Sequence, residues 1–313
     1  MNTRLAPSPT GALHLGNART FLINWLLAKQ DNWKIILRIE DLDGPRIKRG
    51  ADQQLIDDLQ WLGLTWDEGP IYQSTRQDLY AAAIAKLIDA KFAYPCVCSR
   101  SEIETAASAP HAEDGATIYP GTCRGKFSSI EAAKEKSGRA PAIRFAVWDE
   151  TIEWTDGFAG DCRFDVAKQL GDFVIAKNDG TAVYQLSVVV DDAAMDVTHI
   201  VRGNDLIDST PRQILLYRAL GLSESIPKYY HLPLVIGDDG RRLAKRHGDT
   251  RLSYYRDRKV SSGRLLSLLA RWSGIDCDDE TSIDDLVGRF RLGRLPKDLI
   301  IFTQRDDAWL RGS

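Results

Sequence analysis

Residues 3–20 read TRLAPSPTGALHLGNART and residues 34–43 read KIILRIEDLD, and these two stretches decide the fold. The first begins with a short strand at residues 3–6 and a Pro- and Gly-rich loop at 7–11. Apolar residues then recur at helical spacing over 17–29, and residues 34–39 predict a buried strand that ends at Glu40 and Asp41. Strand, helix and strand in this order form a βαβ unit with a parallel pair of strands, so the sequence predicts an α/β protein.

Composition places the chain among ordinary globular proteins. It has 313 residues, of which 43% are hydrophobic and 27% charged, with a net charge of −3. Residues 241–297 differ, with 14 Lys and Arg against 8 Asp and Glu, so a bound polyanion would meet this part. No run of 18 apolar residues occurs, and the start lacks a basic segment followed by an apolar one. We therefore expect a cytoplasmic protein that neither spans a membrane nor is secreted.

The rest of the chain divides into segments of different character. Helical patterns cover residues 50–62 and 77–91, whereas residues 94–160 are rich in Cys, Ser, Pro and Gly and suggest an insertion. Strands at 172–177 and 199–201 and a helix at 211–220 are expected to complete a second βα half. After Gly240 the pattern is mainly helical.

The first strand-to-helix turn contains His14-Leu15-Gly16-Asn17. In open α/β sheets a ligand lies beyond the carboxyl ends of the strands, where a helix start offers free N–H groups to a phosphate. Glycine lets a ligand approach the backbone closely. Taken alone, a histidine at a helix start is more often a cap or a surface residue.

Read together, residues 4–20 and 37–43 closely resemble the class I glutamyl-tRNA synthetases. The resemblance implies a Rossmann-like fold, in which His14, Gly16 and Asn17 bind ATP. It also implies that residues 242–246 form a second loop over the ATP phosphates, with Mg²⁺ accompanying the nucleotide. That loop is degenerate here but keeps Lys245; its residues are Arg242, Leu243, Ala244, Lys245 and Arg246. A fixed cation such as Lys245 stabilises charge that develops in the transition state of adenylate formation. His14, Asn17 and Lys245 are therefore the implied catalytic residues, although the loop alone resembles a solvated basic segment.

Glutamate carries two carboxylates and one ammonium, so a selective site needs two donor-rich pockets and one anion. The family positions that bind this amino acid match Arg4, Ala6, Ser8, Glu40, Tyr184 and Arg202. Glu40 matches the partner of the ammonium, although Glu40 and Asp41 could instead be solvated charges at a strand end. Tyr184 on its own lies in a strand-like segment and would more often be a packing residue.

Three cysteines and a tyrosine cluster within the expected insertion: Cys96, Cys98, Tyr119 and Cys123. Three thiols in a loop-rich segment favour a structural Zn²⁺ over buried free thiols. The Cys-Xaa-Cys and Tyr-Xaa-Xaa-Xaa-Cys spacing resembles that of the short glutamyl-queuosine tRNA(Asp) synthetases, which implies these four ligands. His111 is an alternative fourth ligand to Tyr119.

Together these features predict a Rossmann-like catalytic domain at residues 1–94 and 165–236, a zinc-binding insertion at 95–164, and a small C-terminal helical domain with the ATP loop at 237–313. About 67 residues follow that loop, fewer than the anticodon-binding domains of a full glutamyl-tRNA synthetase need. The resemblance thus implies a monomer that activates L-glutamate with ATP, without tRNA, and transfers it to queuosine in tRNA(Asp). The alternatives are a truncated glutamyl- or glutaminyl-tRNA synthetase that charges the 3′ end, or a non-catalytic protein that binds tRNA or glutamate.

Overall fold

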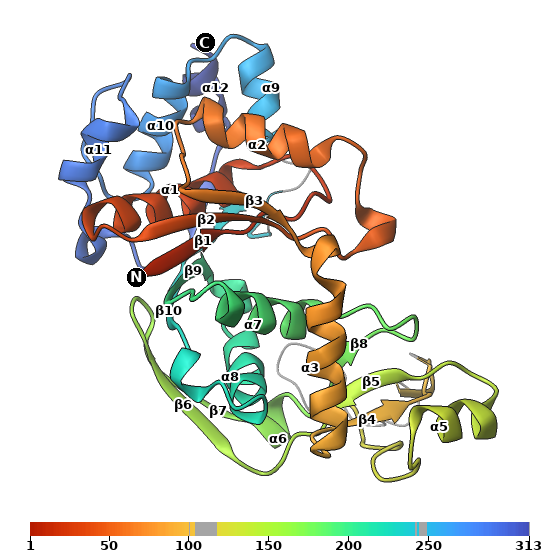
Figure 1. Ribbon diagram of the computed structural model, residues 1–313. Coiled ribbons are helices and arrows are strands. Elements are labelled where there is room, and N and C mark those ends of the chain that lie inside the picture. The colour runs from red at the N-terminus through yellow and green to blue at the C-terminus, as the bar shows by residue number, and fades with distance from the viewer. Residues whose placement is uncertain (100, 104–117, 242, 244–248, 313) are drawn as a thin grey trace.

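The computed structural model (Figure 1) describes residues 1–99, 101–103, 118–241, 243 and 249–312. Within these ranges no helix is both long enough and apolar enough to cross a membrane.

A set of parallel strands, which come from the first part of the chain and from residues 199–232, lies at the centre of the fold. These strands are β1 (Asn2–Leu5), β2 (Lys34–Ile39), β3 (Glu68–Tyr72), β9 (His199–Gly203) and β10 (Lys228–Leu232). β1, β2 and β3 pair in parallel in that order, and β9 pairs in parallel with β10. β9 starts beside β1, where the N–H of Thr198 donates to the carbonyl of Asn2 over 2.9 Å. The strands therefore lie side by side in the order β3-β2-β1-β9-β10. Successive strands are added in one direction from β1 to β3 and in the other direction from β9 to β10, so the order switches between β1 and β9. Open α/β sheets bind ligands at such a switch point.

Helices cover this sheet, and the periodicity predicts all of them except the one that begins at Tyr184. They are α1 (Leu15–Gln30), α2 (Ala51–Trp61), α3 (Gln77–Asp89), α7 (Tyr184–Ala194) and α8 (Ser209–Ala219). α1 is buried on most sides because the strands and the C-terminal helices both pack against it. Asn24 fixes α1 to β1, since its side chain accepts from the hydroxyl of Thr3 and donates to the carbonyl of Arg4.

An antiparallel part lies beyond α3. Its elements are β4 (Ala93–Cys96), β5 (Ala142–Phe145), β6 (Thr151–Asp156), β7 (Gly160–Asp165), β8 (Phe173–Ala176), α5 (Ile130–Ser137) and α6 (Val166–Gln169). β4, β5 and β8 form one antiparallel sheet, and β6 and β7 form a hairpin. The strand expected at residues 172–177 therefore exists but does not join the parallel strands. A short apolar run marks a buried strand without specifying its partner.

The C-terminal part is mainly helical and closes over α1. It contains β11 (Val235–Gly237), α9 (Leu252–Asp257), α10 (Ser262–Arg271), α11 (Ile283–Arg289), β12 (Ile300–Phe302) and α12 (Gln304–Arg311). The side chains of Ser282 and Thr303 cap α11 and α12 through capping boxes. The described part of the chain contains the 3₁₀ turns η1 (Gly44–Arg46), η2 (Gln73–Arg76), η3 (Asn204–Leu206), η4 (Ser223–Ser225) and η6 (Leu292–Arg294).

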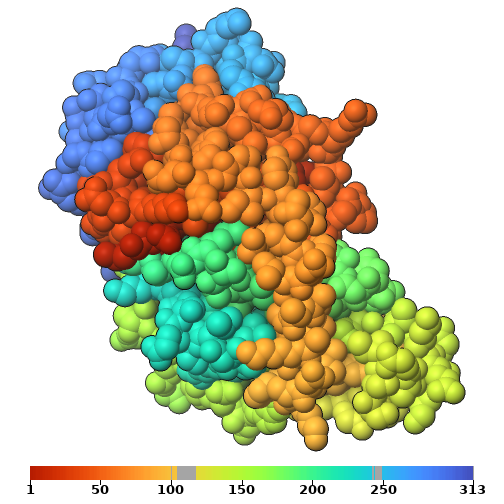
Figure 2. All heavy atoms as spheres, in the orientation of Figure 1, coloured from red at the N-terminus to blue at the C-terminus, as the bar shows by residue number. Residues whose placement is uncertain are grey.

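Two large hydrophobic cores hold these parts together. One joins β1, β2 and α1 to α10, so the C-terminal helices share the core of the N-terminal sheet. The other joins α3, β5 and β8 to α7 and α8. Figure 2 shows α3 as an orange ridge that connects the N-terminal part with the yellow-green insertion. The helix α3 thus links the parallel sheet to the insertion.

Candidate active site

A cavity of about 580 Å³ opens at the carboxyl ends of β1, β2 and β9, beside the start of α1. Ten of the residues singled out from the sequence line it: Arg4, Ala6, Ser8, His14, Gly16, Asn17, Glu40, Tyr184, Arg202 and Leu243. They come from segments separated by as many as 239 residues, counted from Arg4 to Leu243. The tertiary structure therefore brings them together in one site.

The start of α1 forms one end of the cavity. His14 is the residue before α1, and its Nδ1 lies 3.0 Å from the hydroxyl of Thr250. The backbone N–H of Leu15 donates to the carbonyl of the same threonine over 3.1 Å. Burial lowers the pKa of His14, so its imidazole is mainly neutral near pH 7. The loop before α1 is thereby held by the segment that follows residue 248.

Gly16 leaves the first turn of α1 open to the cavity. A Cβ at this position would lie 3.5 Å from the Cβ of Val235, which is an ordinary contact. The fold itself thus tolerates a side chain here, whereas a ligand at the helix start would meet it. The first turn of the 16-residue helix therefore presents backbone N–H groups and its positive dipole end to the cavity.

Another part of the cavity wall is charged. The guanidinium of Arg4 is 5% exposed and lies 3.5 Å from Asp192, measured from Nε to Oδ1. Among the described residues, none accepts a hydrogen bond from this guanidinium. Its Nε is buried beside Asp192, so only its Nη groups can meet a ligand in the cavity that Arg4 lines. Glu40 lies nearby, and burial raises its pKa although the Arg38 guanidinium opposes this effect. A ligand ammonium would favour the ionised form of Glu40.

A network of buried charged side chains contacts Arg4 and Glu40. Arg38 is fully buried and contacts three carboxylates: Asp192 at 2.6 Å, Glu40 at 3.1 Å and Asp191 at 3.9 Å. Asp191 also accepts hydrogen bonds from the side chains of Gln73, Arg76 and Tyr80. Because Asp192 contacts both Arg38 and Arg4, the network connects the strand β2 to the guanidinium that faces the cavity.

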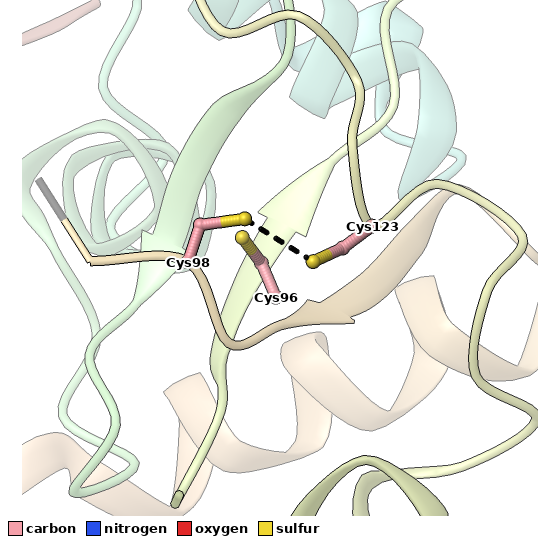
Figure 3. A group of neighbouring side chains, drawn as sticks. All are labelled: Cys96, Cys98 and Cys123. Atoms are coloured by element: carbon pink, nitrogen blue, oxygen red, sulfur yellow. Dashed lines mark hydrogen bonds between the residues drawn. The ribbon is translucent and has the colours of Figure 1, made fainter. Parts of the chain in front are cut away.

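A second candidate site lies in the insertion, where three thiols converge. The Sγ atoms of Cys96, Cys98 and Cys123 lie within 4.8 Å of one another, and those of Cys98 and Cys123 are 3.4 Å apart. Figure 3 shows the three sulfur atoms turned toward one another, with Cys96 at the end of β4. A tetrahedral zinc with Zn–S bonds of about 2.3 Å needs S···S separations of roughly 3.8 Å, so the spacing fits a metal ion.

Tyr119 supplies a fourth oxygen donor at the same place. Its hydroxyl lies 3.4 Å from Cys96 Sγ and 3.5 Å from Cys98 Sγ. The guanidinium of Arg144 covers the Tyr119 ring at 3.9 Å and donates to Cys96 Sγ over 3.3 Å. The cluster could therefore hold a metal ion through three sulfur atoms and one oxygen.

Residues 1–289 match the family model described as the catalytic domain of class I tRNA synthetases for glutamate and glutamine. This chain belongs to that family. It is therefore a ligase of the aminoacyl-tRNA synthetase type.

Three relatives illustrate the likeness. The chain is 46% identical to a glutamyl-Q tRNA(Asp) synthetase of Symbiobacterium thermophilum, over 99% of this chain and 98% of that one. It is 41% identical to a glutamate–tRNA ligase of Citrifermentans bemidjiense, over 98% of this chain but 64% of the ligase. A crystal structure of a glutamate tRNA ligase from Elizabethkingia meningosepticum in complex with its amino acid superposes with a TM-score of 0.83 at 28% identity, covering 99% of this chain and 68% of that one.

Some residues named from the sequence of this class I synthetase lie outside the described residues. These are Arg242, Ala244, Lys245 and Arg246 of the expected ATP loop, and the alternative metal ligand His111. One expectation about local structure was wrong. Tyr184 is not in a strand, because it begins α7 after Val183 in extended conformation. Its hydroxyl faces Arg202, whose Nη1 lies 3.4 Å away.

Sequence reasoning missed the buried network of this synthetase. Arg38 was noted as part of a motif but given no role, and Asp191 and Asp192 were not singled out. A signal existed, because an arginine interrupts the apolar strand β2 and two aspartates follow Val188, Val189 and Val190 in α7. Charged residues are rarely fully buried unless they are paired, so charges in two apolar segments suggest partners.

Proposed function

We propose that this synthetase activates L-glutamate with ATP, without tRNA, and transfers it to the queuosine base at the wobble position of tRNA(Asp). The observation that carries the first half is the charged part of the cavity wall. It combines the available guanidinium of Arg4 with the carboxylate of Glu40. An amino acid with an extra carboxylate matches this pairing, and a neutral isostere would leave a buried charge without a partner.

Activation follows from the arrangement of this charged part and the start of α1. Arg4 binds a carboxylate of the substrate and Glu40 binds its ammonium, with Ala6, Ser8, Tyr184 and Arg202 forming the surrounding wall. The start of α1 with His14, Gly16 and Asn17 binds the ATP phosphates, accompanied by Mg²⁺. The α-carboxylate oxygen attacks the α-phosphorus, and pyrophosphate leaves. Lys245 neutralises the charge on the transferring phosphoryl group, together with its neighbours in residues 242–246.

The second half rests on the relatives. A protein 46% identical over almost the whole of both chains is named for the queuosine reaction. Transfer requires a hydroxyl of the queuosine cyclopentenediol to attack the activated acyl carbon, which releases AMP and forms an ester. We propose that the enzyme acts on this base as a monomer and that residues 241–297 supply phosphate contacts through their local positive charge.

We further propose that Cys96, Cys98, Tyr119 and Cys123 bind one structural Zn²⁺. The convergence of three thiols and one phenol supports this ligand set. The ion would stabilise a segment whose own hydrophobic cluster is small, without taking part in the reaction.

Two measurements test the proposed function. Glutamate-dependent exchange of pyrophosphate into ATP, measured without RNA, tests the activation step. Transfer of labelled glutamate to an anticodon stem-loop of tRNA(Asp) tests the acceptor, with queuosine in one sample and guanosine in the matched control. Guanosine lacks the cyclopentenediol, so the control accepts no glutamate.

One alternative acceptor has support of its own. The glutamate–tRNA ligase of Citrifermentans bemidjiense is 41% identical over nearly all of this chain. Glutamate at the 3′ terminal adenosine of tRNA(Glu), with none on the queuosine stem-loop, would show that the protein charges the 3′ end. Absence of exchange with glutamate, both without RNA and after tRNA is added, would show a binding protein without the enzyme activity.

A further inference from the structure

Arg202 has a protein acceptor for each of its five N–H groups. It lies in β9, is 4% exposed and forms part of the cavity wall. Its Nε donates to Nε2 of the His231 imidazole over 2.9 Å. Its other acceptors are the side chains of Gln213, Tyr184 and Thr210 and the carbonyl of Leu206. The plane of this guanidinium is therefore set by the protein before any substrate arrives. Its contact from Nη1 to the Tyr184 hydroxyl is the longest, at 3.4 Å, and is the one that a substrate carboxylate in the cavity can replace.

The contact with His231 depends on a third residue. Nδ1 of His231 lies 2.6 Å from Oδ2 of Asp156, at the end of β6. A guanidinium can only donate, so Nε2 of His231 must carry its lone pair toward Arg202. The proton of the neutral ring is then on Nδ1, where the Asp156 carboxylate accepts it. The two partners thus select one tautomer of the imidazole.

Asp156 is itself held firmly. Its Oδ1 accepts from the backbone N–H groups of Phe158, Ala159 and His231 over 2.8 to 3.0 Å. Burial alone would raise its pKa, but the hydrogen bonds from His231 and from these N–H groups hold it below the ordinary value. Asp156 therefore stays ionised and acts only as an acceptor.

We propose that Asp156 and His231 are positioning residues that fix the Arg202 guanidinium for glutamate binding, with Asp156 setting the tautomer of His231 and His231 accepting from Nε of Arg202. The inference rests on the proposed function, in which Arg202 faces the amino acid. It assigns a role to the β6–β7 hairpin, which reaches the amino-acid part of the cavity through this chain of three side chains.

A pH dependence follows from the same contacts. The groups around His231 are Asp156 from β6, Arg202 from β9, Thr210 from α8 and the ring of Tyr229, whose centroid is 6.0 Å away. Burial lowers the pKa of His231, and the Arg202 charge adds to this, whereas Asp156 opposes it. A protonated ring would offer Arg202 an N–H and a like charge, so Arg202 would lose its acceptor at low pH.

Two variants of His231 separate positioning from simple packing. In His231→Gln the side-chain oxygen can reach the Nε2 position and accept from Arg202, whereas in His231→Asn the amide reaches only the Asp156 side. We expect His231→Asn to raise the glutamate KM in pyrophosphate exchange by about tenfold or more, and His231→Gln to raise it much less. The KM for ATP should stay unchanged in both. His199→Asn is the control. Like His231 in β10, His199 in β9 is buried, but it stacks on Trp33 and does not line the cavity.

The pH profile is the second readout. The glutamate KM of the wild type should rise toward low pH while the ATP KM stays flat. In Asp156→Asn the anion that supports the imidazolium is absent, so the rise should move to lower pH. A glutamate KM that is equal in both His231 variants and the wild type, or a profile that Asp156→Asn leaves in place, would overturn the inference.

These outcomes differ from failure of the proposed function. If the wild type shows no glutamate-dependent exchange, the activity is wrong whatever the variants do. If the wild type is active and either His231 variant fails to fold, the inference is tested by the pH profiles of the glutamate KM in the wild type and in Asp156→Asn. If Asp156→Asn also fails to fold, Asp156→Ser takes its place. A rise in the glutamate KM that moves to lower pH supports the inference, and a rise that stays at the wild-type pH, as protonation of Glu40 alone would give, overturns it.

Discussion

Replacing Asp192 with asparagine tests whether the buried network holds Arg4, the arginine that we propose binds glutamate. Oδ1 of Asp192 lies 2.6 Å from Arg38 Nη1 and 3.5 Å from Arg4 Nε, and its side chain is fully buried. After the change, Arg38 still has Glu40 and Asp191, but Arg4 has no carboxylate within ion-pair distance among the described residues. The variant is isosteric, so the change removes charge and not volume.

The magnitude follows from these contacts. Removing one partner of a buried ion pair costs about 3–5 kcal/mol, and the two remaining carboxylates of Arg38 favour the lower end, about 3 kcal/mol. For a chain of 313 residues that loss corresponds to a decrease in Tm of roughly 5 °C. Because Arg4 is less firmly held, its charged hydrogen bond to glutamate weakens, and the glutamate KM should rise by about tenfold or more.

Asp191→Asn is the matched control. Asp191 is equally buried and accepts from Gln73, Arg76 and Tyr80, but it has no contact with Arg4. It should lower Tm by a similar amount while changing the glutamate KM by less than about twofold. Thermal unfolding followed by circular dichroism gives Tm, and pyrophosphate exchange gives both KM values. Equal glutamate KM values in the two variants would refute the idea that Asp192 acts through Arg4.

Four further outcomes are expected. Lys245→Ala should lower kcat for pyrophosphate exchange by on the order of 10²-fold with little change in glutamate binding, because its cation acts mainly in the transition state; exchange at the wild-type rate would contradict this role. Purified protein should contain about one zinc by elemental analysis, and Cys98→Ser should lose it while the parallel strands stay folded; metal-free protein prepared without chelator would argue against the site. Burial raises the pKa of Asp58 from 3.8 to about 6, so the folded state binds the extra proton and stability falls as pH rises from about 4 to 6. Urea unfolding should therefore show Asp58→Asn gaining up to about 3 kcal/mol relative to the wild type over this window, and a difference that does not change with pH would contradict it. Arg294→Glu should weaken transfer to the queuosine stem-loop and reduce its salt dependence without changing exchange, because a phosphate contact releases counterions and activation involves no RNA; an equal loss in both assays would point to misfolding.

Local sequence patterns were sufficient to predict where several of the strands and helices begin and end. The strands at residues 2–5 and 34–39 and the helices at 51–61, 77–89 and 209–219 lie within about two residues of the segments that periodicity predicts. This success has a simple cause, since each element must turn an apolar face toward a core. The resemblance then named residues that line one cavity, although they are far apart in the sequence.

Local patterns could not predict which distant segments of the chain pack or pair with one another. The run Phe173–Ala176 was expected among the parallel strands, yet it pairs antiparallel with β5. Tyr184 was expected in a strand-like segment but begins a helix. In both cases a few apolar residues fit either environment, and the packing of other elements decided between them.

The sequence by itself determined the parallel α/β arrangement, the family and the cluster of three cysteines, because these depend on local periodicity and on short motifs. Only the tertiary structure decided which charges neutralise one another beneath the cavity. Arg38 meets Asp192 across 154 positions of the chain, and His231 meets Asp156 across 75. A buried charge is stable only beside its partner, and the sequence records that both are present without recording that they touch.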